Sequence, residues 1–563
     1  MVKWSVNKRT ALLVLANAIV LVVVLNQLAA LFPVRADLTE EKRYTVKPQT
    51  IALLQSLQED VFVEVFLEGD LNPGFRRFQR SIREMLDEFA VRSNGRIRFT
   101  FTDPGAATGA QARNAFMTGL MERGLAPLNI IDNKDGQQSQ KIVFPGALIS
   151  YAGAETAVNL LKNNSARGSQ VALNQSIETL EFELVSGISR LVRQEVPMVG
   201  WITGHGEADG PAVASVKSAL REQFDLVQLD LPNVKAISGP ELVIIARPVM
   251  RWSDADLYKL DQFVMHGGRV MVFIDNINAE MQQASATDYY PALIDHGLDG
   301  LLFRYGARVN PDLVQDAVAL PYPVVTGTVA GKSQFTPMDW PFFPLVSRYA
   351  DHPATRNLDA SLFRFVSSID TIGSGSAAKV PLMLTSPYTR TLTAPVKVGI
   401  DDLRNGVDPK RFSGGQKITG LLLEGSFTSL FRNRFKPEGT DEQPIAEQGS
   451  SRVVVISDGD FILNDVDPRD GKPVPLGFDR MTGQTFANSE VILNLAAWLA
   501  DAQGIINARS RTVTLRPLDK NLIREERLYW QLLNLGLPVV LMALVGSGLA
   551  WWRRKRFTGF NQN

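Results

Sequence analysis

Two long apolar segments without charged side chains lie near the two ends of the chain. The first spans residues 11–32 and the second spans residues 529–552. An α-helix rises about 1.5 Å per residue, so each segment reaches about 33 Å or more, enough to cross the apolar core of a bilayer. The pattern predicts a transmembrane helix at each end. The alternatives are a cleaved signal peptide for the first segment and a buried core helix for the second.

The second apolar segment carries further features of a membrane helix. Aromatic side chains, which are enriched at membrane–water interfaces, lie at both of its ends: Tyr529, Trp530, Trp551 and Trp552. Pro538, Gly546 and Gly548 lie inside it. A proline can kink a membrane helix, and glycines let a neighbouring helix approach closely. We therefore expect these three residues to take part in helix packing.

Basic residues outside the two apolar segments predict their orientation. Lys3, Lys8 and Arg9 lie in the tail 1–10, and the tail 553–563 begins with four consecutive basic residues. The opposite flanks mix basic with acidic residues. Positively charged flanks remain in the cytoplasm. The sequence thus predicts two cytoplasmic tails, with the bulk of the chain in the periplasm beside a bacterial inner membrane.

The region 33–195 alternates between two hydrophobic periods. Residues 61–67 are mainly apolar and β-branched, which favours a strand, and residues 97–102 are predicted as a second strand that Asp103-Pro104 closes. Residues 75–91 repeat their apolar side chains at helical spacing. A helix at 110–123 and strands at 128–131, 141–151 and 156–160 complete the order βαβαβββ. This order resembles a thioredoxin-like layer. The Cys-x-x-Cys motif of thioredoxins is missing, so the unit is expected to be a scaffold.

The region 196–525 predicts a second α/β unit. Residues 242–246 (LVIIA) form a continuous apolar run, as expected of a strand buried on both faces. Strands at 199–203 and 269–274 alternate with helices at 212–223 and 254–266, which implies a doubly wound sheet. Residues 320–450 are interpreted as an insertion that is loop-rich where prolines concentrate and disordered over the polar stretch 433–450.

Composition removes several classes of function. The chain has 563 residues, 59 basic and 59 acidic side chains, four histidines and no cysteine. A balanced charge disfavours a nucleic-acid-binding protein. Without cysteine there is no disulfide, thiolate metal site or cysteine nucleophile. The sequence predicts no cofactor and no metal site. Two short matches to ATPase motifs, at 331–333 and 413–416, lack the required surroundings, so the chain is not expected to be an ATPase.

The segment Gly204-His205-Gly206-Glu207 follows the strand 199–203 directly. Ligands of open α/β sheets bind at this end of the strands. The segment therefore permits three interpretations: a tight structural turn with a hydrogen-bonded histidine, a non-catalytic binding crevice, or acid–base chemistry. The structural turn is favoured.

Further candidate residues end other strands of the same unit. Asp275 follows the strand 269–274, Arg247 follows 242–246, and Asp458 and Asp460 follow a predicted strand at 452–456. Clustered carboxylates could bind a divalent cation. Such carboxylates more often cap a helix or accept hydrogen bonds from loop amides. Together with residues 204–207, these four are the candidate ligand- or partner-binding residues.

The order of several motifs resembles a known family. The segments are Asp37-Leu38-Thr39 with Lys42-Arg43-Tyr44-Thr45, the turn 204–207, residues 241–248, residues 260–263 with 267–269, residues 457–461 and residues 475–479. With the two flanking apolar segments, they resemble the auxiliary component of gliding-motility-type (GldG-like) ABC transporters. The match is weak over 320–450.

The resemblance implies a membrane subunit that works with a multispanning ABC permease and a cytoplasmic ABC ATPase. It also implies that the second α/β unit is similar to the class I glutamine amidotransferase-like fold of intraflagellar-transport (GIFT-type) domains. Amidotransferase chemistry needs a cysteine nucleophile, which this chain lacks. The leading hypothesis is a non-enzymatic transporter subunit that binds a cargo or an envelope partner. The alternatives are an extracytoplasmic hydrolase that uses His205 and Glu207, and a structural envelope anchor.

Overall fold

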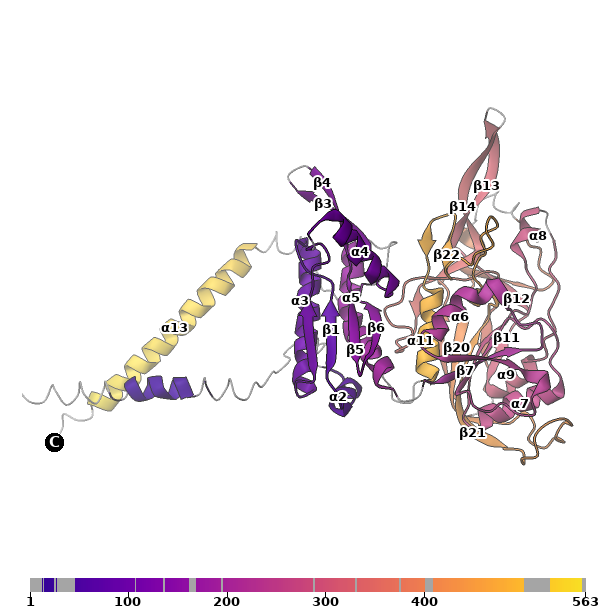
Figure 1. Ribbon diagram of the computed structural model, residues 1–563, viewed down its shortest axis with the longest axis horizontal. Coiled ribbons are helices and arrows are strands. Elements are labelled where there is room, and N and C mark those ends of the chain that lie inside the picture. The colour runs from indigo at the N-terminus through magenta and orange to yellow at the C-terminus, as the bar shows by residue number, and fades with distance from the viewer. Residues whose placement is uncertain are drawn as a thin grey trace, which may run out of the picture. The chain divides into compact units, whose positions relative to one another are not determined.

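The computed structural model describes most of the chain. The described residues are 13, 15–24, 27, 46–106, 108–134, 137–161, 169–193, 196–286, 289–329, 332–373, 376–399, 409–500 and 527–558. The chain divides into two compact units, Met1–Thr512 and Val513–Asn563. The first unit is mixed α/β, and the described part of the second is a single helix (Figure 1).

The N-terminal lobe of the first unit contains a four-stranded sheet in the order β2-β1-β5-β6. Strands β1 and β2 are parallel, whereas β5 is antiparallel to both β1 and β6. The elements of this lobe are α2 (Pro48–Ser56), β1 (Val61–Val65), α3 (Pro73–Arg92), β2 (Ile97–Phe101), α4 (Ala110–Glu122), β3 (Leu128–Lys134), β4 (Gln137–Val143), β5 (Gly146–Tyr151), β6 (Ala154–Asn159) and α5 (Ser169–Val192).

Helix α3 illustrates why these residues fold as they do. Asn72 caps its first turn by accepting a hydrogen bond from the Phe75 amide. Phe78, Ile82 and Phe89 are fully buried on one stripe, as the apolar spacing predicts. The single strand predicted at 141–151 is wrong. Pro145, which cannot donate a ladder hydrogen bond, separates β4 from β5, and β4 pairs with β3 in a separate hairpin.

The C-terminal lobe is built on a large sheet with five parallel strands at one side, in the order β8-β7-β9-β10-β21. Its first elements are β7 (Met198–Thr203), α6 (Ala214–Arg221), β8 (Asp225–Asp230), β9 (Leu242–Ala246), α7 (Asp254–Met265), β10 (Arg269–Phe273), α8 (Met281–Ala286), α9 (Asp299–Tyr305), β11 (Ala307–Val309) and β12 (Asp312–Asp316). In chain order these parallel strands lie 2-1-3-4-5. The order therefore reverses between β7 and β9.

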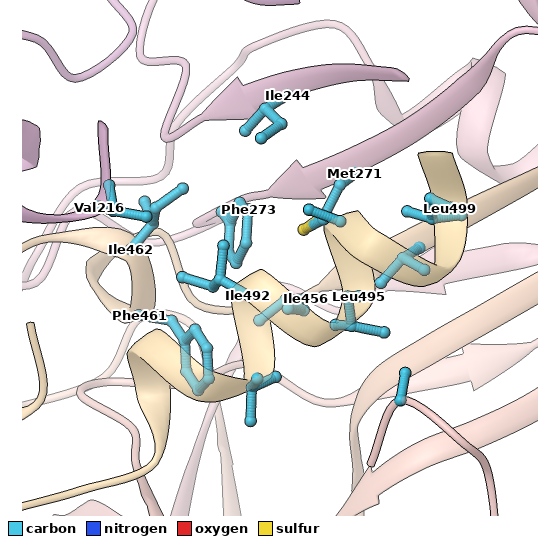
Figure 2. Close-up of a cluster of buried hydrophobic side chains, with 14 of the residues drawn as sticks. Val216, Ile244, Met271, Phe273, Ile456, Phe461, Ile462, Ile492, Leu495 and Leu499 are labelled. Atoms are coloured by element: carbon cyan, nitrogen blue, oxygen red, sulfur yellow. The ribbon is translucent and has the colours of Figure 1, made fainter. Parts of the chain in front are cut away.

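Strand β9 has no exposed residue, which explains its continuous apolar sequence. Leu242 and Ile244 pack into one core with α6 and α11, whereas Val243 and Ile245 pack into another with α7 and α9. The five parallel strands are therefore covered by helices on both faces, as predicted. Figure 2 shows the first of these cores, where α11 (Asn488–Ala500) lies along β10 and β21. The labelled side chains are Val216, Ile244, Met271, Phe273, Ile456, Phe461, Ile462, Ile492, Leu495 and Leu499.

The predicted insertion contributes both a protruding hairpin and strands of the main sheet. Its elements, with those that follow, are β13 (Ala319–Val329), β14 (Lys332–Val346), β15 (Arg348–Tyr349), β16 (Ser361–Leu362), β17 (Ile369–Thr371), β18 (Ala378–Leu384), β19 (Thr389–Thr393), β20 (Ile418–Thr428), β21 (Gln448–Ile456), β22 (Phe478–Asp479) and β23 (Gln484–Thr485). Strand β20 pairs antiparallel with β21 and extends the main sheet. Strands β13 and β14 form the long hairpin at the top of Figure 1.

Two expectations for this region are wrong. The proline-rich stretch forms long strands because Pro323 faces Pro337 in the register, a position where neither residue needs to donate a ladder bond. The polar stretch 433–450 is not disordered. The Lys436 Nζ lies 2.9 Å from the Asp441 carboxylate, and the Ala446 amide donates to the Gln262 side chain over 2.7 Å. Strand β21 begins inside the same stretch.

The described part of the second unit is the helix α13 (Arg527–Thr558). Its segment Gln531–Trp552 has a mean hydropathy of 2.0 and no buried residue, so by length and composition it can cross a membrane. This agrees with the predicted helix at 529–552. Near the other end of the chain, Leu15–Val24 is a shorter apolar helix. Most of the rest of the predicted span 11–32 lies outside the described residues.

Candidate functional site

The candidate residues gather at the carboxyl ends of the parallel strands. The turn 204–207 follows β7, Arg247 follows β9, Asp275 lies just after β10, and Asp458 and Asp460 follow β21. The first two of these strands flank the point where the strand order reverses, which is where ligands of such sheets bind. The structure thus places all of the sequence-predicted residues of this sheet at one edge.

The two glycines of the turn are required by its shape. Gly204 and Gly206 have positive φ angles of 123° and 74°, which other residues rarely adopt. A Cβ at Gly204 would lie 2.4 Å from Pro232, and one at Gly206 would lie 2.6 Å from Val249. The His205 carbonyl between them accepts hydrogen bonds from two amides of the segment after β9, those of Val249 (3.1 Å) and Met250 (2.9 Å). The turn therefore fastens β7 to β9.

The His205 side chain is buried, with 3% of its surface exposed. Its Nδ1 lies 3.2 Å from Glu207 Oε1, and its Nε2 lies 3.1 Å from Asp256 Oδ2. The ring stacks on Trp252 at a centroid distance of 4.2 Å. Glu207 also accepts the His205 amide over 2.7 Å. Both ring nitrogens and one ring face are thus engaged, as the structural-turn interpretation expects.

Asp256 connects this turn to the first turn of α7. Ser253 caps the helix and donates to Asp256 Oδ2 over 2.6 Å. Lys259 Nζ lies 2.8 Å from Asp256 Oδ1 and donates to the Leu231 carbonyl over 2.9 Å. With His205 protonated, two cations and two carboxylates balance in this buried network. We call His205, Glu207, Asp256 and Lys259 the histidine network.

The histidine network favours the protonated imidazole. Burial opposes protonation of His205, but hydrogen bonds to Glu207 and Asp256 and the charges of these two groups outweigh it and raise its pKa. Burial also acts against ionised Asp256. Its hydrogen bonds with Lys259, Ser253 and His205 prevail and lower its pKa. The network therefore contains an ion pair on each side of Asp256.

This raised pKa predicts a pH dependence of stability. The folded-state pKa of His205 lies above its ordinary value of about 6.5. The contribution of protonated His205 to the free energy of unfolding is therefore fully present below about pH 6.5. It is lost as the pH rises through the folded-state pKa. We expect the melting temperature to fall across that window in thermal denaturation of the full-length chain in detergent. The slope above about pH 7 should disappear in His205→Gln.

Asp275→Asn is the matched control for this pH effect. Burial first, and then the charge of Asp460, raise the pKa of Asp275 to about 7. Protonation of Asp275 also stabilises the folded state at lower pH. This contribution is lost as the pH rises to the folded-state pKa of about 7, so Asp275 adds little pH dependence above that value. The slope at higher pH should persist in Asp275→Asn. An unchanged slope in His205→Gln would contradict the assignment.

A second polar cluster, the aspartate cluster, consists of Arg247, Asp275, Asp458 and Asp460. Arg247 has a φ of 52°, and its Nε lies 3.0 Å from Asp275 Oδ2 and 3.4 Å from Asp460 Oδ1. Asp275 Oδ1 accepts the Gly459 amide over 2.7 Å. The aspartate cluster thus fastens the ends of β9, β10 and β21 together.

Asp458 is fully buried and accepts three backbone amides. These are the amides of Asp460 (2.8 Å), Phe461 (3.1 Å) and Arg364 (2.7 Å). Burial raises the pKa of Asp458 well above its ordinary value, and the charges of Asp275 and Asp460 add to this effect. Burial also raises the pKa of Asp460. Asp458 therefore acts as a cap for the loop and the short 3₁₀ helix Asp460–Ile462 that follow β21.

The chemistry available to the aspartate cluster is limited by these contacts. The cavity beside Asp460 and Arg364 has a volume of about 20 Å³, which holds about one water molecule. Among the described residues, no group of three or more His, Asp or Glu side chains is arranged to hold a metal ion. The carboxylates of the cluster are instead bonded to Arg247 and to backbone amides.

Sequence reasoning missed Trp252, Asp256, Lys259 and Arg364. Asp256 is 51 residues from His205, and Arg364 is 94 residues from Asp458. The Ser253 cap before the predicted helix 254–266 is the one local signal that marks Asp256, since it locates the first turn of that helix. Arg364 lies inside the region whose strands were not predicted, so no local pattern marked it.

Fold and site together define a class of α/β protein. Its parallel sheet carries a buried polar turn at the point where the strand order reverses. Among the described residues, one helix can cross a membrane by length and composition. Residues 197–495 match the family described as an ABC-type uncharacterized transport system, and the chain belongs to this family. Residues 40–150 match a domain of unknown function.

Individual relatives are distant. An uncharacterized protein of Borreliella burgdorferi is 21% identical over 492 residues, which cover 85% of each chain. Among solved structures, the mmIFT52 N-terminal domain is 14% identical, with a TM-score of 0.31 over 54% of this chain and 98% of that one. A thua-like protein of Parabacteroides merdae is 13% identical, with a TM-score of 0.25 over 54% of this chain and 90% of that one.

Proposed function

We propose that this chain is a non-catalytic membrane subunit of an ABC transporter complex, of the gliding-motility type. It works with a separate multispanning permease and a cytoplasmic ATPase, and its large periplasmic region binds a cargo or an envelope partner. The match of 197–495 to a transport-system family carries this proposal. Neither ATPase-like motif opens a helix, since Lys332 and Ser333 begin strand β14 and residues 413–416 precede strand β20. The ATPase is therefore expected on another chain.

The fold assignments belong to the same proposal. The N-terminal lobe is thioredoxin-like, which the parallel β1–β2 pair and the antiparallel β5 support. The C-terminal lobe is amidotransferase-like of the GIFT type, which the 2-1-3-4-5 order of its parallel strands supports. Because the chain has no cysteine, this lobe lacks the nucleophile of an amidotransferase.

The state of His205 supports a non-catalytic role. A general base must reach a substrate proton within hydrogen-bond distance. Both ring nitrogens of His205 are already held by carboxylates, and the ring is covered by Trp252. A hydrolase based on His205 and Glu207 would have to break this buried network in every cycle. The observed contacts therefore favour a scaffold that carries binding surfaces.

The membrane arrangement is proposed from the two apolar segments. Both spans cross the inner membrane, the two tails are cytoplasmic, and α13 packs against the permease. In the described structure, nothing lies within 4 Å of where a Cβ would be at Gly546 or Gly548. Both glycines are thus open to close approach by another helix. Pro538 lies inside α13, where a partner helix can compensate the missing backbone donor.

Co-purification tests the proposal. A tagged full-length chain, extracted from native membranes in mild detergent, is expected to retain a multispanning permease and an ABC ATPase, identified by mass spectrometry. Gly546→Leu should reduce permease recovery by about 10-fold, because the added side chain prevents close helix contact. Ser547→Leu, on a different side of α13, is the matched control. Repeated recovery of the chain alone, stable and monodisperse, would contradict the proposal and favour a free-standing anchor or an enzyme.

A further inference from the structure

The loop 429–447, which joins β20 to β21, presents a phenylalanine to solvent. Phe435 is 99% exposed. The next most exposed large apolar side chain that the structure describes between residues 1 and 512 is Tyr290, at 66%. Single apolar side chains are common at protein surfaces. A ring with almost no contact to its own protein is unusual, because even partial contact removes apolar area from water.

Buried contacts hold the base of this loop in place. The carboxylate of Asp261, which is fully buried, accepts the Ser429 hydroxyl over 2.6 Å and the Leu430 amide over 2.9 Å. Phe431 is 3% exposed and packs edge-on against Tyr258 at a centroid distance of 5.2 Å. The loop is therefore fixed to helix α7 only a few residues before Phe435.

Contacts on both sides of Phe435 also fix the tip of the loop. Before it, Asn433 has a φ of 67°, and the Arg434 amide donates to the Phe431 carbonyl over 2.9 Å, which closes a tight turn. After it, the Lys436 Nζ lies 2.9 Å from the Asp441 carboxylate. The exposure of Phe435 is therefore a property of an ordered turn that directs the ring outward.

The loop lies at the amino ends of the parallel strands, since β21 begins directly after it. Helix α7 ends at the same edge, where the Met265 carbonyl lies against Gly449. Helix α11 ends there as well, because the Arg452 guanidinium lies 4.4 Å from the ring centroid of Trp498, in the last turn of α11. The edge that carries Phe435 is thus the edge from which the sequence continues toward α13.

Two arginines of the loop, Arg432 and Arg434, are exposed beside the ring. Aromatic rings are enriched at membrane–water interfaces, and guanidinium groups bind phosphates such as those of lipids. The loop also carries Glu438 and Glu442, both exposed, so its charge gives no net attraction to anionic lipid. Insertion of the apolar ring is therefore the driving force that these residues offer.

We propose that the loop 429–447 docks on the surface of a phospholipid bilayer, with Phe435 inserted at the level of the headgroups. Helix α13 favours a bilayer over a protein pocket as the partner, because by length and composition it can cross a membrane and so tethers the chain to one. Transfer of a phenylalanine side chain from water to an apolar medium favours the inserted state by about 10-fold or more. Tethering raises the effective concentration of the loop at the membrane.

This inference rests on the membrane arrangement of the proposed function and goes beyond it, because it assigns the C-terminal lobe a membrane contact of its own. Labelling at a single cysteine tests it, since the chain contains no other cysteine. Full-length Phe435→Cys, labelled with an NBD fluorophore, is placed in nanodiscs of phosphatidylcholine and phosphatidylglycerol. We expect blue-shifted emission that is quenched by lipids with a doxyl spin label close to the headgroup.

Two further label positions are the controls. Tyr388→Cys is matched in exposure, at 61%, and follows β18 at the opposite end of the sheet, so its label should remain in water. Leu544→Cys, at an exposed residue of α13, should carry its label inside the bilayer. Thermal denaturation of each labelled chain confirms that it is folded.

A label at Glu438, in a chain that keeps Phe435, separates the effect of the ring from that of the fluorophore. Glu438 is exposed in the same loop, so the label of Glu438→Cys should also be quenched by the lipids. Adding Phe435→Ser should lower the ratio of docked to undocked loop by about 10-fold. Quenching at this position that does not depend on Phe435 would contradict the inference.

Other outcomes also decide against it. If the label at residue 435 stays in water while the label at residue 544 is quenched, the docking is wrong and the membrane arrangement stands. The docking is also wrong if the labels at residues 435 and 388 are quenched alike. Shielding of residue 435 from aqueous iodide without quenching by lipids would replace the bilayer with a protein partner. An unquenched label at residue 544 would overturn the membrane arrangement and the docking together.

Discussion

Replacing His205 with alanine is expected to lower the free energy of unfolding by about 3–5 kcal/mol. The substitution leaves Glu207 and Asp256 buried without the imidazole that lies between them. It also removes the ring that stacks on Trp252. Lys259 still pairs with Asp256, so the loss falls mainly on Glu207. Chemical denaturation of the full-length chain in detergent, followed by tryptophan fluorescence, measures the effect.

His266→Ala is the matched control for this prediction. His266 is exposed at the end of α7, where its Nδ1 lies 2.7 Å from the Gln262 carbonyl. Its loss should cost no more than about 1 kcal/mol. If His205→Ala lowered the free energy of unfolding no more than His266→Ala does, the histidine network would not stabilise this end of the sheet. His205 would then be free for the binding or catalytic role that its buried contacts oppose.

The strands of the parallel sheet and the helices that cover it could be predicted from the sequence. A strand that is buried on both faces has a continuous run of apolar residues, which is easy to recognise. The run at 242–246 is strand β9, and the helix predicted at 254–266 is α7 (Asp254–Met265). The hairpin β13–β14 could not be predicted, since its prolines are tolerated only by its particular register. Register is a property of the pair of strands and not of either strand alone.

The candidate site was predictable only in part, for a related reason. Strand ends carry local signals, so His205, Asp275 and Asp458 could be placed at one edge of a sheet from sequence alone. Their partners come from distant segments: Asp256 from a helix and Arg364 from a loop before β17. Whether a histidine at a strand end is catalytic or structural depends on those partners. The sequence left that choice open, and the contacts now favour the structural role.

Asp458→Ala is expected to destabilise the chain by about 3–5 kcal/mol, because it leaves three backbone donors without an acceptor at the end of β21. The amides of Asp460 and Phe461 begin the short 3₁₀ helix, and the Arg364 amide belongs to a segment 94 residues away in sequence. The same denaturation measurement detects the loss. Asp467→Ala, at a more exposed aspartate in a loop, should leave the stability nearly unchanged.

Asp458→Asn separates the charge of Asp458 from its role as an acceptor. Burial, Asp275 and Asp460 raise the pKa of Asp458 well above its ordinary value, so a neutral side chain suits this position. Asparagine keeps one oxygen, which can accept the two amides of the 3₁₀ helix, and loses the bond to Arg364. We therefore expect Asp458→Asn to cost about 1–2 kcal/mol, well below the cost of alanine. Equal losses in the two variants would show that the negative charge itself holds this edge of the sheet, and would return the aspartate cluster to consideration as a cation site.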